Sequence, residues 1–465
     1  MVGMVRRPGR PGGPQHRPEV RTNPLERLIQ KFREFDLLRP LVFQHREAKG
    51  NQPPQKSQDA VWVQTDQNGN TTFAVIDIAS SRSTPDGRIE LVQTNKLAHQ
   101  LSAHGPGIRT EDPEAILNHL NQQAEKYQEP FAGVVGDIKV LPPAKISVKL
   151  AHQGDVKVWA ITPDGKIYFL SPEPPEEEIQ AAEDFWDQLS QANDAGLLHG
   201  KLRNLYIQIT SRWENAKNQR IHPDLPEKER LRHLQALKNA YAEYILRSMY
   251  PAIKQLHGHN KKTLTLQQAA EKYKNQLNKL IRTPHRISAT LPPGTTIIAH
   301  TDGIPVPPDY FIGNSPKKIL QLARKLKKDD RGLLVLRTPT IPQNQEHMRQ
   351  LAEILGQLPS AYRQMLIDLA KTQARELMLE GRLAEADYNK IIAGALKQLS
   401  VAAKRYPPTT TTRLRATFAR TFGRFVTWLP NKIPSDITRY SRADGSRLAE
   451  LLKQAYPEIL ALLRE

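Results

Sequence analysis

The chain has 465 residues, 38% hydrophobic and 25% charged, so it is long enough for more than one domain and apolar enough to bury a core. It has no cysteine, which excludes disulfides, cysteine-ligated zinc, iron–sulfur clusters and thiol nucleophiles. Its 67 Lys and Arg residues against 48 Asp and Glu give a net charge of +19, which fits either an acidic partner or a basic surface that is merely solvated.

The N-terminal region differs from the rest of the chain. Residues 1–24 are rich in Pro, Gly and Arg and predict a disordered basic arm. They lack the apolar segment of a secretory signal, and no apolar run approaches the ~18–20 residues that span a bilayer. We therefore expect a soluble, cytoplasmic protein. Residues 25–35 carry Leu, Ile and Phe at helical spacing and predict a short amphipathic helix.

Short runs rich in β-formers then recur, at residues 60–65, 71–77, 145–152, 155–162, 166–171, 295–303 and 332–337. The first two are joined by Asp-Gln-Asn-Gly-Asn, a strong hairpin signal. The run at 145–152 and the two after it are separated by Gln153-Gly154 and Pro163-Asp164-Gly165, which predict tight turns and a three-stranded antiparallel meander.

Helical patterns lie between and after these runs. Residues 112–127, 174–195 and 315–327 read as helices, so the fold class is α+β with antiparallel sheets. Residues 211–286 are polar, basic and helical without a strand pattern, which predicts a helical insertion. Residues 341–465 are helical throughout. We therefore expect one α+β domain at 25–340 and an all-helical, basic C-terminal domain after it.

Acidic residues stand at the ends of several predicted strands. They are Asp59, Asp77, Asp302, Asp329 and Asp330. Carboxylates raised on different strands can converge on hard cations, which prefer oxygen ligands. Two such ions can activate water and neutralise a phosphoryl group. The alternative is that Asp ends strands because it favours turns.

The order of these acids and of the residues around them resembles the metal-dependent type 2C Ser/Thr protein phosphatases, over about residues 40–338. The stretches that carry the resemblance are Ser57-Gln58-Asp59-Ala60, residues 73–78, Gly154-Asp155 with its flanking strands, Thr301-Asp302-Gly303, and Asp329-Asp330 before the last strand.

The resemblance implies a two-sheet antiparallel β-sandwich flanked by helices, with two Mg²⁺ or Mn²⁺ ions at one end. It implies metal ligands at Asp77, Asp302 and Asp329 or Asp330, with the backbone carbonyl of Ile78. Asp59 would orient a metal-bound water, and that water would attack a phosphoserine or phosphothreonine directly. The implied partner is therefore a phosphoprotein.

Three departures from the family favour a second hypothesis. Gln58 replaces the family's Glu, Ile78 replaces its Gly, and the phosphate-binding Arg upstream has no clear match, with Arg46 and Lys56 as weak substitutes. The alternative is a catalytically inactive scaffold or regulator whose basic helices bind nucleic acid or an acidic protein.

The candidate residues for such binding lie in the C-terminal domain. They are Lys404, Arg405, Arg413, Arg415, Arg420 and Arg424, interleaved with Phe418, Phe422 and Phe425. The three Phe side chains share one helical face, which suits packing on a core with a basic exterior, contact with nucleic acid or an acidic partner, or an interfacial helix on anionic lipid. His257-Gly258-His259 could be a metal pair or a solvated loop.

Overall fold

The computed structural model describes residues 40–49, 52–66, 69–79, 81–83, 88–92, 94–108, 110–141, 145–256, 260–277, 284–327, 329–339, 377 and 379–381. The expected arm at 1–24, the helix at 25–35, the His257–His259 pair and the six basic candidates from Lys404 to Arg424 lie outside them. No described helix combines the length and the apolar character needed to cross a membrane.

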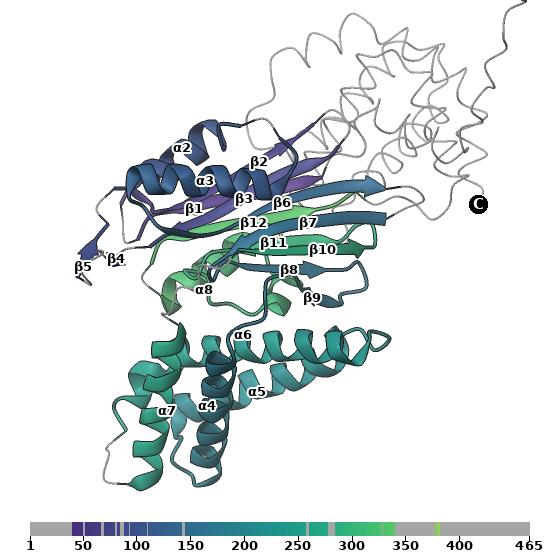
Figure 1. Ribbon diagram of the computed structural model, residues 1–465. Coiled ribbons are helices and arrows are strands. Elements are labelled where there is room, and N and C mark those ends of the chain that lie inside the picture. The colour runs from purple at the N-terminus through teal and green to yellow at the C-terminus, as the bar shows by residue number, and fades with distance from the viewer. Residues whose placement is uncertain are drawn as a thin grey trace, which may run out of the picture.

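Two five-stranded antiparallel sheets form the centre of the molecule (Figure 1). Sheet A has the order β1 (Leu41–Glu47), β12 (Arg331–Arg337), β11 (Thr296–His300), β8 (Lys157–Ile161), β9 (Ile167–Phe169). Sheet B has the order β10 (His285–Leu291), β7 (Lys145–Gln153), β6 (Phe131–Leu141), β3 (Thr71–Ile78), β2 (Asp59–Thr65). The short strands β4 (Ser81–Ser83) and β5 (Ile89–Leu91) pair with each other. The expectation of an α+β sandwich is confirmed.

The core between the sheets comes from alternate residues of each strand. Ile146, Val148 and Leu150 of β7 are buried in it together with Val158 and Ala160 of β8. Since side chains alternate between the faces of a strand, the residues between them point outward. The two sheets therefore bury one apolar face each against the other.

The hairpin expected at 60–77 is present, because β2 and β3 pair in antiparallel register. The expected meander is wrong in its first half. β7 pairs with β6 and β10 in sheet B, whereas β8 pairs with β9 and β11 in sheet A. Gly154, with φ of +81°, turns the chain from one sheet to the other. The inward faces of β7 and β8 are both apolar, so the strands stack across the core instead of pairing.

Helices cover both outer faces of the sandwich. α2 (Lys96–His104) and α3 (Pro113–Tyr127) pack on sheet B, and α8 (Pro316–Leu326) packs on sheet A with the 3-10 turn η2 (Pro308–Phe311). The side chains of Asp112 and Ser315 cap α3 and α8 by accepting backbone N–H bonds. A second 3-10 turn, η1 (Pro54–Lys56), leads into β2.

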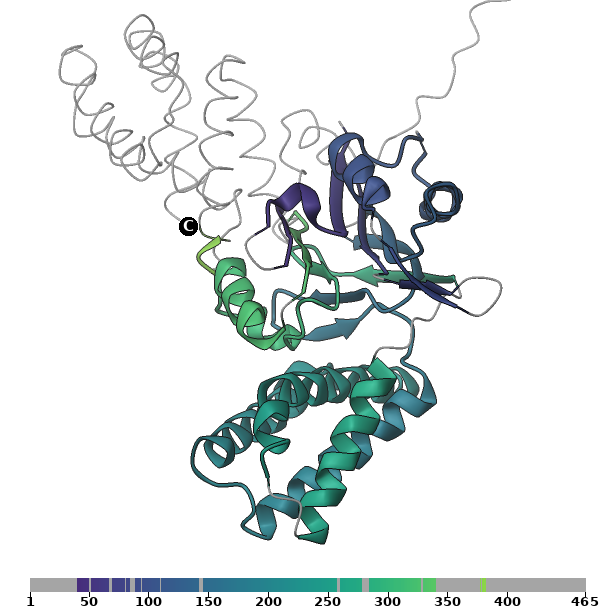
Figure 2. The same cartoon turned by 90° about the vertical axis from the view of Figure 1, so that its left-hand side faces the viewer.

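Four helices between β9 and β10 form a helical unit beyond sheet A (Figure 2): α4 (Glu176–Asp194), α5 (Gly200–Arg220), α6 (Glu227–Ile253) and α7 (Lys261–Leu277). The unit therefore includes the helix expected at 174–195, and the last residues of the 211–286 segment belong to strand β10. Phe185, Trp213 and Tyr241 lie in its own apolar core. That core explains how so polar a segment folds.

Buried polar contacts attach the helical unit to sheet A. Lys157 of β8 forms an ion pair with Glu243 of α6. Nδ1 of His233 on α6 accepts a hydrogen bond from the backbone N–H of Phe169 at 3.0 Å. Ala236 and Ala240 of α6 also pack into the apolar layer on the outer face of the sheet. α6 thus belongs to both cores, and it fixes the orientation of the unit.

Candidate functional site

Six Asp residues from different elements gather at one end of the sandwich, and we call them the acid cluster. Asp59 and Asp77 lie directly opposite each other in the β2–β3 ladder. Asp155 lies in the β7–β8 connection, and Asp302 follows β11. Asp329 and Asp330 precede β12. The structure therefore brings together all five acids expected from the sequence and adds Asp155.

Burial and mutual repulsion raise the pKa of several of these carboxyls. Burial raises the pKa of Asp59 well above its usual value, and Asp330 and Asp302 add to the effect. Burial also raises the pKa of Asp77, again with help from Asp59 and Asp302. Burial, with repulsion from Asp302, raises the pKa of Asp155 to about 6. The carboxyls are close enough for each to oppose the ionisation of its neighbours.

Asp330 and Asp59 of the acid cluster accept hydrogen bonds from neighbouring strand ends. Asp330 accepts hydrogen bonds from the backbone N–H of Lys49 at 2.6 Å and of Gln58 at 2.5 Å, one on each carboxylate oxygen. Asp59 accepts a bond from the hydroxyl of Thr301 at 2.6 Å. These bonds join the start of β2 to the segments that follow β1 and β11 and to the start of β12, so they support the geometry of this end of the sandwich.

A lysine lies within the acid cluster. Nζ of Lys327 forms ion pairs with Asp302 and, at 2.9 Å, with Asp329. The lysine side chain is only 15% exposed. Burial opposes its charge, but Asp302 and Asp329 outweigh that effect and hold its pKa above the usual value. The Lys327 carbonyl in turn accepts a bond from the guanidinium of Arg331. An ammonium ion therefore already neutralises the side of the cluster where β11 and β12 meet.

The residues present do not fit two bound Mg²⁺ or Mn²⁺ ions. Among the described residues, no three acidic or His side chains are arranged to hold a metal. Both oxygens of Asp330 are engaged by backbone amides, and Asp302 and Asp329 are engaged by Lys327. Ile78 is 2% exposed and lies in the apolar layer under α2 and α3. Its carbonyl as a ligand stays a prediction.

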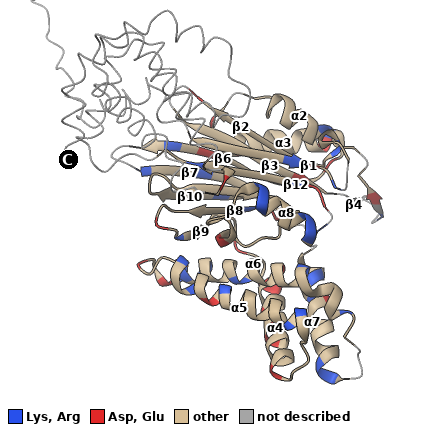
Figure 3. Ribbon diagram, turned by 180° about the vertical axis from the view of Figure 1, so that it is seen from behind, with Lys and Arg blue, Asp and Glu red and all other residues tan. Residues whose placement is uncertain are grey.

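One weak candidate from the sequence does approach the cluster. Arg46 of β1 donates to the carbonyl of Ser57 at 2.7 Å. Burial lowers its pKa, while Asp59 and Asp330 favour its charge. Lys327 itself was missed. The sequence did hold a signal for it: Lys327 belongs to a basic run that begins on α8 and continues to Lys328, directly before Asp329. Figure 3 shows that run as blue segments of α8 beside the sheets.

The comparisons with known proteins concern the fold. No protein-family model matches the sequence, and no curated protein matches it. Three solved structures that match are RsbX in complex with magnesium (14% identity, 64% of this chain, 94% of that chain, TM-score 0.31), the S. agalactiae serine/threonine phosphatase (9%, 64%, 98%, 0.30) and the Mycobacterium tuberculosis serine/threonine phosphatase PstP/Ppp (13%, 64%, 98%, 0.29). The structure is similar to those of type 2C Ser/Thr phosphatases.

Proposed function

We propose that this protein is a binding or regulatory protein built on a phosphatase-like sandwich, without the metal-dependent hydrolysis of phosphoserine and phosphothreonine. One observation carries the proposal: Lys327 is paired with both Asp302 and Asp329 inside the acid cluster. An ammonium ion in this place supplies positive charge, but it has no open coordination position and cannot lower the pKa of a bound water as a metal does.

The other members of the cluster support this proposal. Asp330 and Asp59 accept hydrogen bonds that join strands. Moving either carboxylate toward a metal would break its bonds to the backbone N–H groups or to the Thr301 hydroxyl. The amides of Lys49 and Gln58 are only partly buried, so each lost bond would cost about 0.5–1.5 kcal/mol. Two ions would have to displace Lys327 and also reorganise these bonds.

A metal-dependent phosphatase remains the second candidate, and one observation favours it. Asp77 lies among Asp59, Asp302, Asp155 and Asp329, and all four raise its pKa. A divalent cation is one way to relieve such repulsion. The resemblance implies that Asp77 would hold the ions and that the chemistry would be attack of water on phosphorus.

The experiment uses the full chain with and without Mn²⁺, on a phosphoserine peptide and on an aryl phosphate. Wild type is compared with Asp77→Asn. We expect no Mn²⁺-dependent hydrolysis above the Asp77→Asn background and no heat of Mn²⁺ binding by calorimetry. Hydrolysis that requires Mn²⁺ and is lost in Asp77→Asn would replace this proposal with the second candidate.

The partner is also a proposal. The net charge of +19 favours an acidic protein or nucleic acid, bound through basic surface. Charge-driven binding of this kind weakens steeply as salt rises. The six basic residues from Lys404 to Arg424 stay predictions for that surface.

A further inference from the structure

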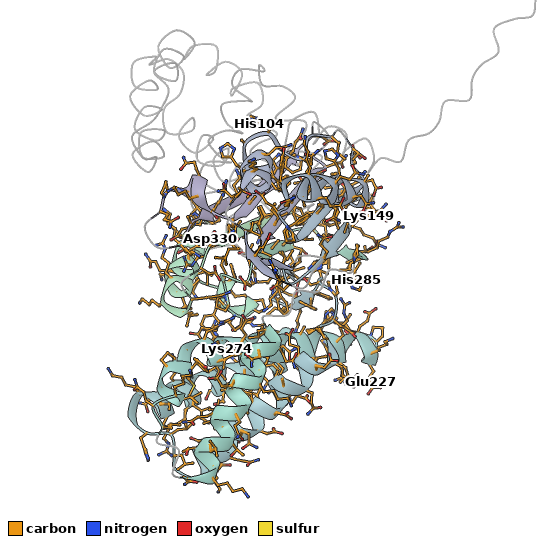
Figure 4. The ribbon with its side chains drawn as sticks, turned by 60° about the vertical axis from the view of Figure 1, so that its left-hand side comes forward. His104, Lys149, Glu227, Lys274, His285 and Asp330 are labelled. Atoms are coloured by element: carbon orange, nitrogen blue, oxygen red, sulfur yellow. The ribbon has the colours of Figure 1, made fainter. Side chains whose placement is uncertain are left out.

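A cavity of about 90 Å³ lies where the β7–β8 connection of the sandwich meets the helical unit. Its walls include Phe169 and the segment Pro172–Pro175 after β9, and Glu178 of α4 and Asp155 also line it. Figure 4 labels His285, another lining residue, on the part of the sandwich next to the helical unit. Several prolines make this wall stiff, because each fixes its own φ.

The charge of the lining is mostly negative, and part of it is already neutralised. Glu243 pairs with Lys157, and Asp302 pairs with Lys327. Asp155 and Glu178 form no ion pair with any residue that the structure describes. Burial, with repulsion from Glu243 and Asp155, raises the pKa of Glu178 to about 7. Lys157 also lines the cavity and attracts both groups, but its ammonium is paired with Glu243, so neither Asp155 nor Glu178 has a counter-ion of its own.

His152 provides an independent observation. It lines the cavity and is 1% exposed. Its Nε2 bonds to the carbonyl of Val156, so Nε2 carries the hydrogen, because a carbonyl only accepts. Burial lowers the pKa of His152 to about 4, which leaves the ring neutral near pH 7. Nδ1 is then a bare acceptor, and it has no partner among the described residues.

We propose that this cavity binds the cationic end of an organic amine or guanidine, with Asp155 and Glu178 supplying the negative charge and His152 Nδ1 accepting one hydrogen bond. A buried acceptor without a donor is costly, so the missing group is a donor. Because Asp155 and Glu178 also lie in the lining without ion pairs of their own, we infer that the donor is positively charged.

The size of the cavity decides between classes of cation. A cavity of ~150 Å³ holds a benzene ring, and one water takes ~30 Å³ of liquid volume. About 90 Å³ is therefore enough for one guanidinium or alkylammonium head group. A divalent metal fits less well, because no three acidic or His side chains among the described residues are arranged to hold one. The cavity shares Asp155 and Asp302 with the acid cluster, whereas Glu178 and His152 lie outside the cluster, so variants of Glu178 test this proposal separately from the chemistry of the cluster.

The test measures binding to the full chain by calorimetry at pH 7.5. The probes are agmatine, N-acetylarginine amide and its neutral isostere N-acetylcitrulline amide. We expect the two guanidinium probes to bind and the citrulline derivative to bind at least tenfold more weakly. Glu178→Gln keeps the size of the side chain and should weaken the guanidinium probes at least tenfold. The control Glu176→Gln removes an exposed carboxylate two residues earlier on α4 and should leave binding unchanged.

Each other outcome has a meaning. Equal binding of the arginine and citrulline derivatives, or equal losses in Glu178→Gln and Glu176→Gln, would overturn the proposal. So would Mn²⁺ binding that depends on Glu178 while neither guanidinium probe binds. Two results would support the proposal and identify the source of the cation. Tighter binding of agmatine than of N-acetylarginine amide would indicate a small free amine as the ligand, and the reverse order would indicate a basic side chain of a protein partner.

Discussion

At the scale of single residues, the end of the sandwich depends on close backbone approach. Gly303 follows Asp302 where the chain leaves β11. A Cβ built on Gly303 would lie 1.8 Å from the carbonyl oxygen of Asp330. Because that oxygen belongs to the backbone, a change of side-chain rotamer cannot remove the clash. The Asp-Gly pair at this point therefore has a packing reason, and Gly303 sets how near the chain after β11 comes to the start of β12.

We expect Gly303→Ala to lower the free energy of unfolding by about 3 kcal/mol, the upper part of the range for forcing a methyl group into a packed site. The measurement is urea unfolding. The control is Gly196→Ala, where the added Cβ meets nothing within 4 Å and the backbone φ is +69°. It should cost about 1 kcal/mol, through the left-handed backbone alone. Equal losses in the two variants would mean that the chain after β11 moves aside freely.

At the scale of elements, α6 is attached to sheet A through an acceptor that must stay neutral. Nδ1 of His233 accepts from the backbone N–H of Phe169, so this nitrogen cannot carry a proton while the bond exists. Burial, with Arg232 nearby, lowers the pKa of His233 from 6.5 to about 4. Acid therefore acts against the contact between helix and sheet.

The sign of the pH dependence follows from this shift. Below about pH 6.5 His233 takes up a proton in the unfolded chain but not in the folded one, so its contribution to stability is lost as the pH falls toward 4. His233→Gln keeps an acceptor for Phe169 without the titration. The stability of wild type minus that of the variant should fall by about 3 kcal/mol between pH 7 and pH 4. Subtraction removes the opposite effect of the carboxyls with raised pKa, and a difference that is constant with pH would contradict the argument.

The sequence predicted the elements that local residues determine, and it failed where distant residues decide. The helix expected at 112–127 is present as α3, and the β2–β3 hairpin follows from Asn-Gly between two β-rich runs. The change of sheet at Gly154 does not, because a tight turn can lead to either pairing or stacking. The strand-end acids did predict where the carboxyls meet. The pairing of Lys327 with Asp302 joins residues 25 positions apart and depends on how α8 packs on sheet A.

At the scale of the whole molecule, the acid cluster joins the two sheets. The source of its positive charge, a bound metal or Lys327, decides whether the stability of the fold depends on metal. Asp59 and Asp77 come from sheet B, while Asp302 and Asp329 flank strands of sheet A. A metal that binds only the folded state would add about 2.7 kcal/mol at one hundred times its dissociation constant. A lysine that is part of the chain supplies one positive charge to the cluster at any metal concentration.

We therefore expect the melting temperature of wild type to be the same in EDTA and in millimolar Mn²⁺. Lys327→Met should lower the free energy of unfolding by about 1–3 kcal/mol, because it leaves Asp302 and Asp329 without their partner while both keep some contact with solvent. Mn²⁺ should then raise the melting temperature of this variant, since the carboxyls can accept another cation. The control is Lys325→Met, an exposed lysine two residues earlier, which should behave as wild type in both solutions. A wild type that EDTA destabilises would show that metal, and not Lys327, balances the cluster.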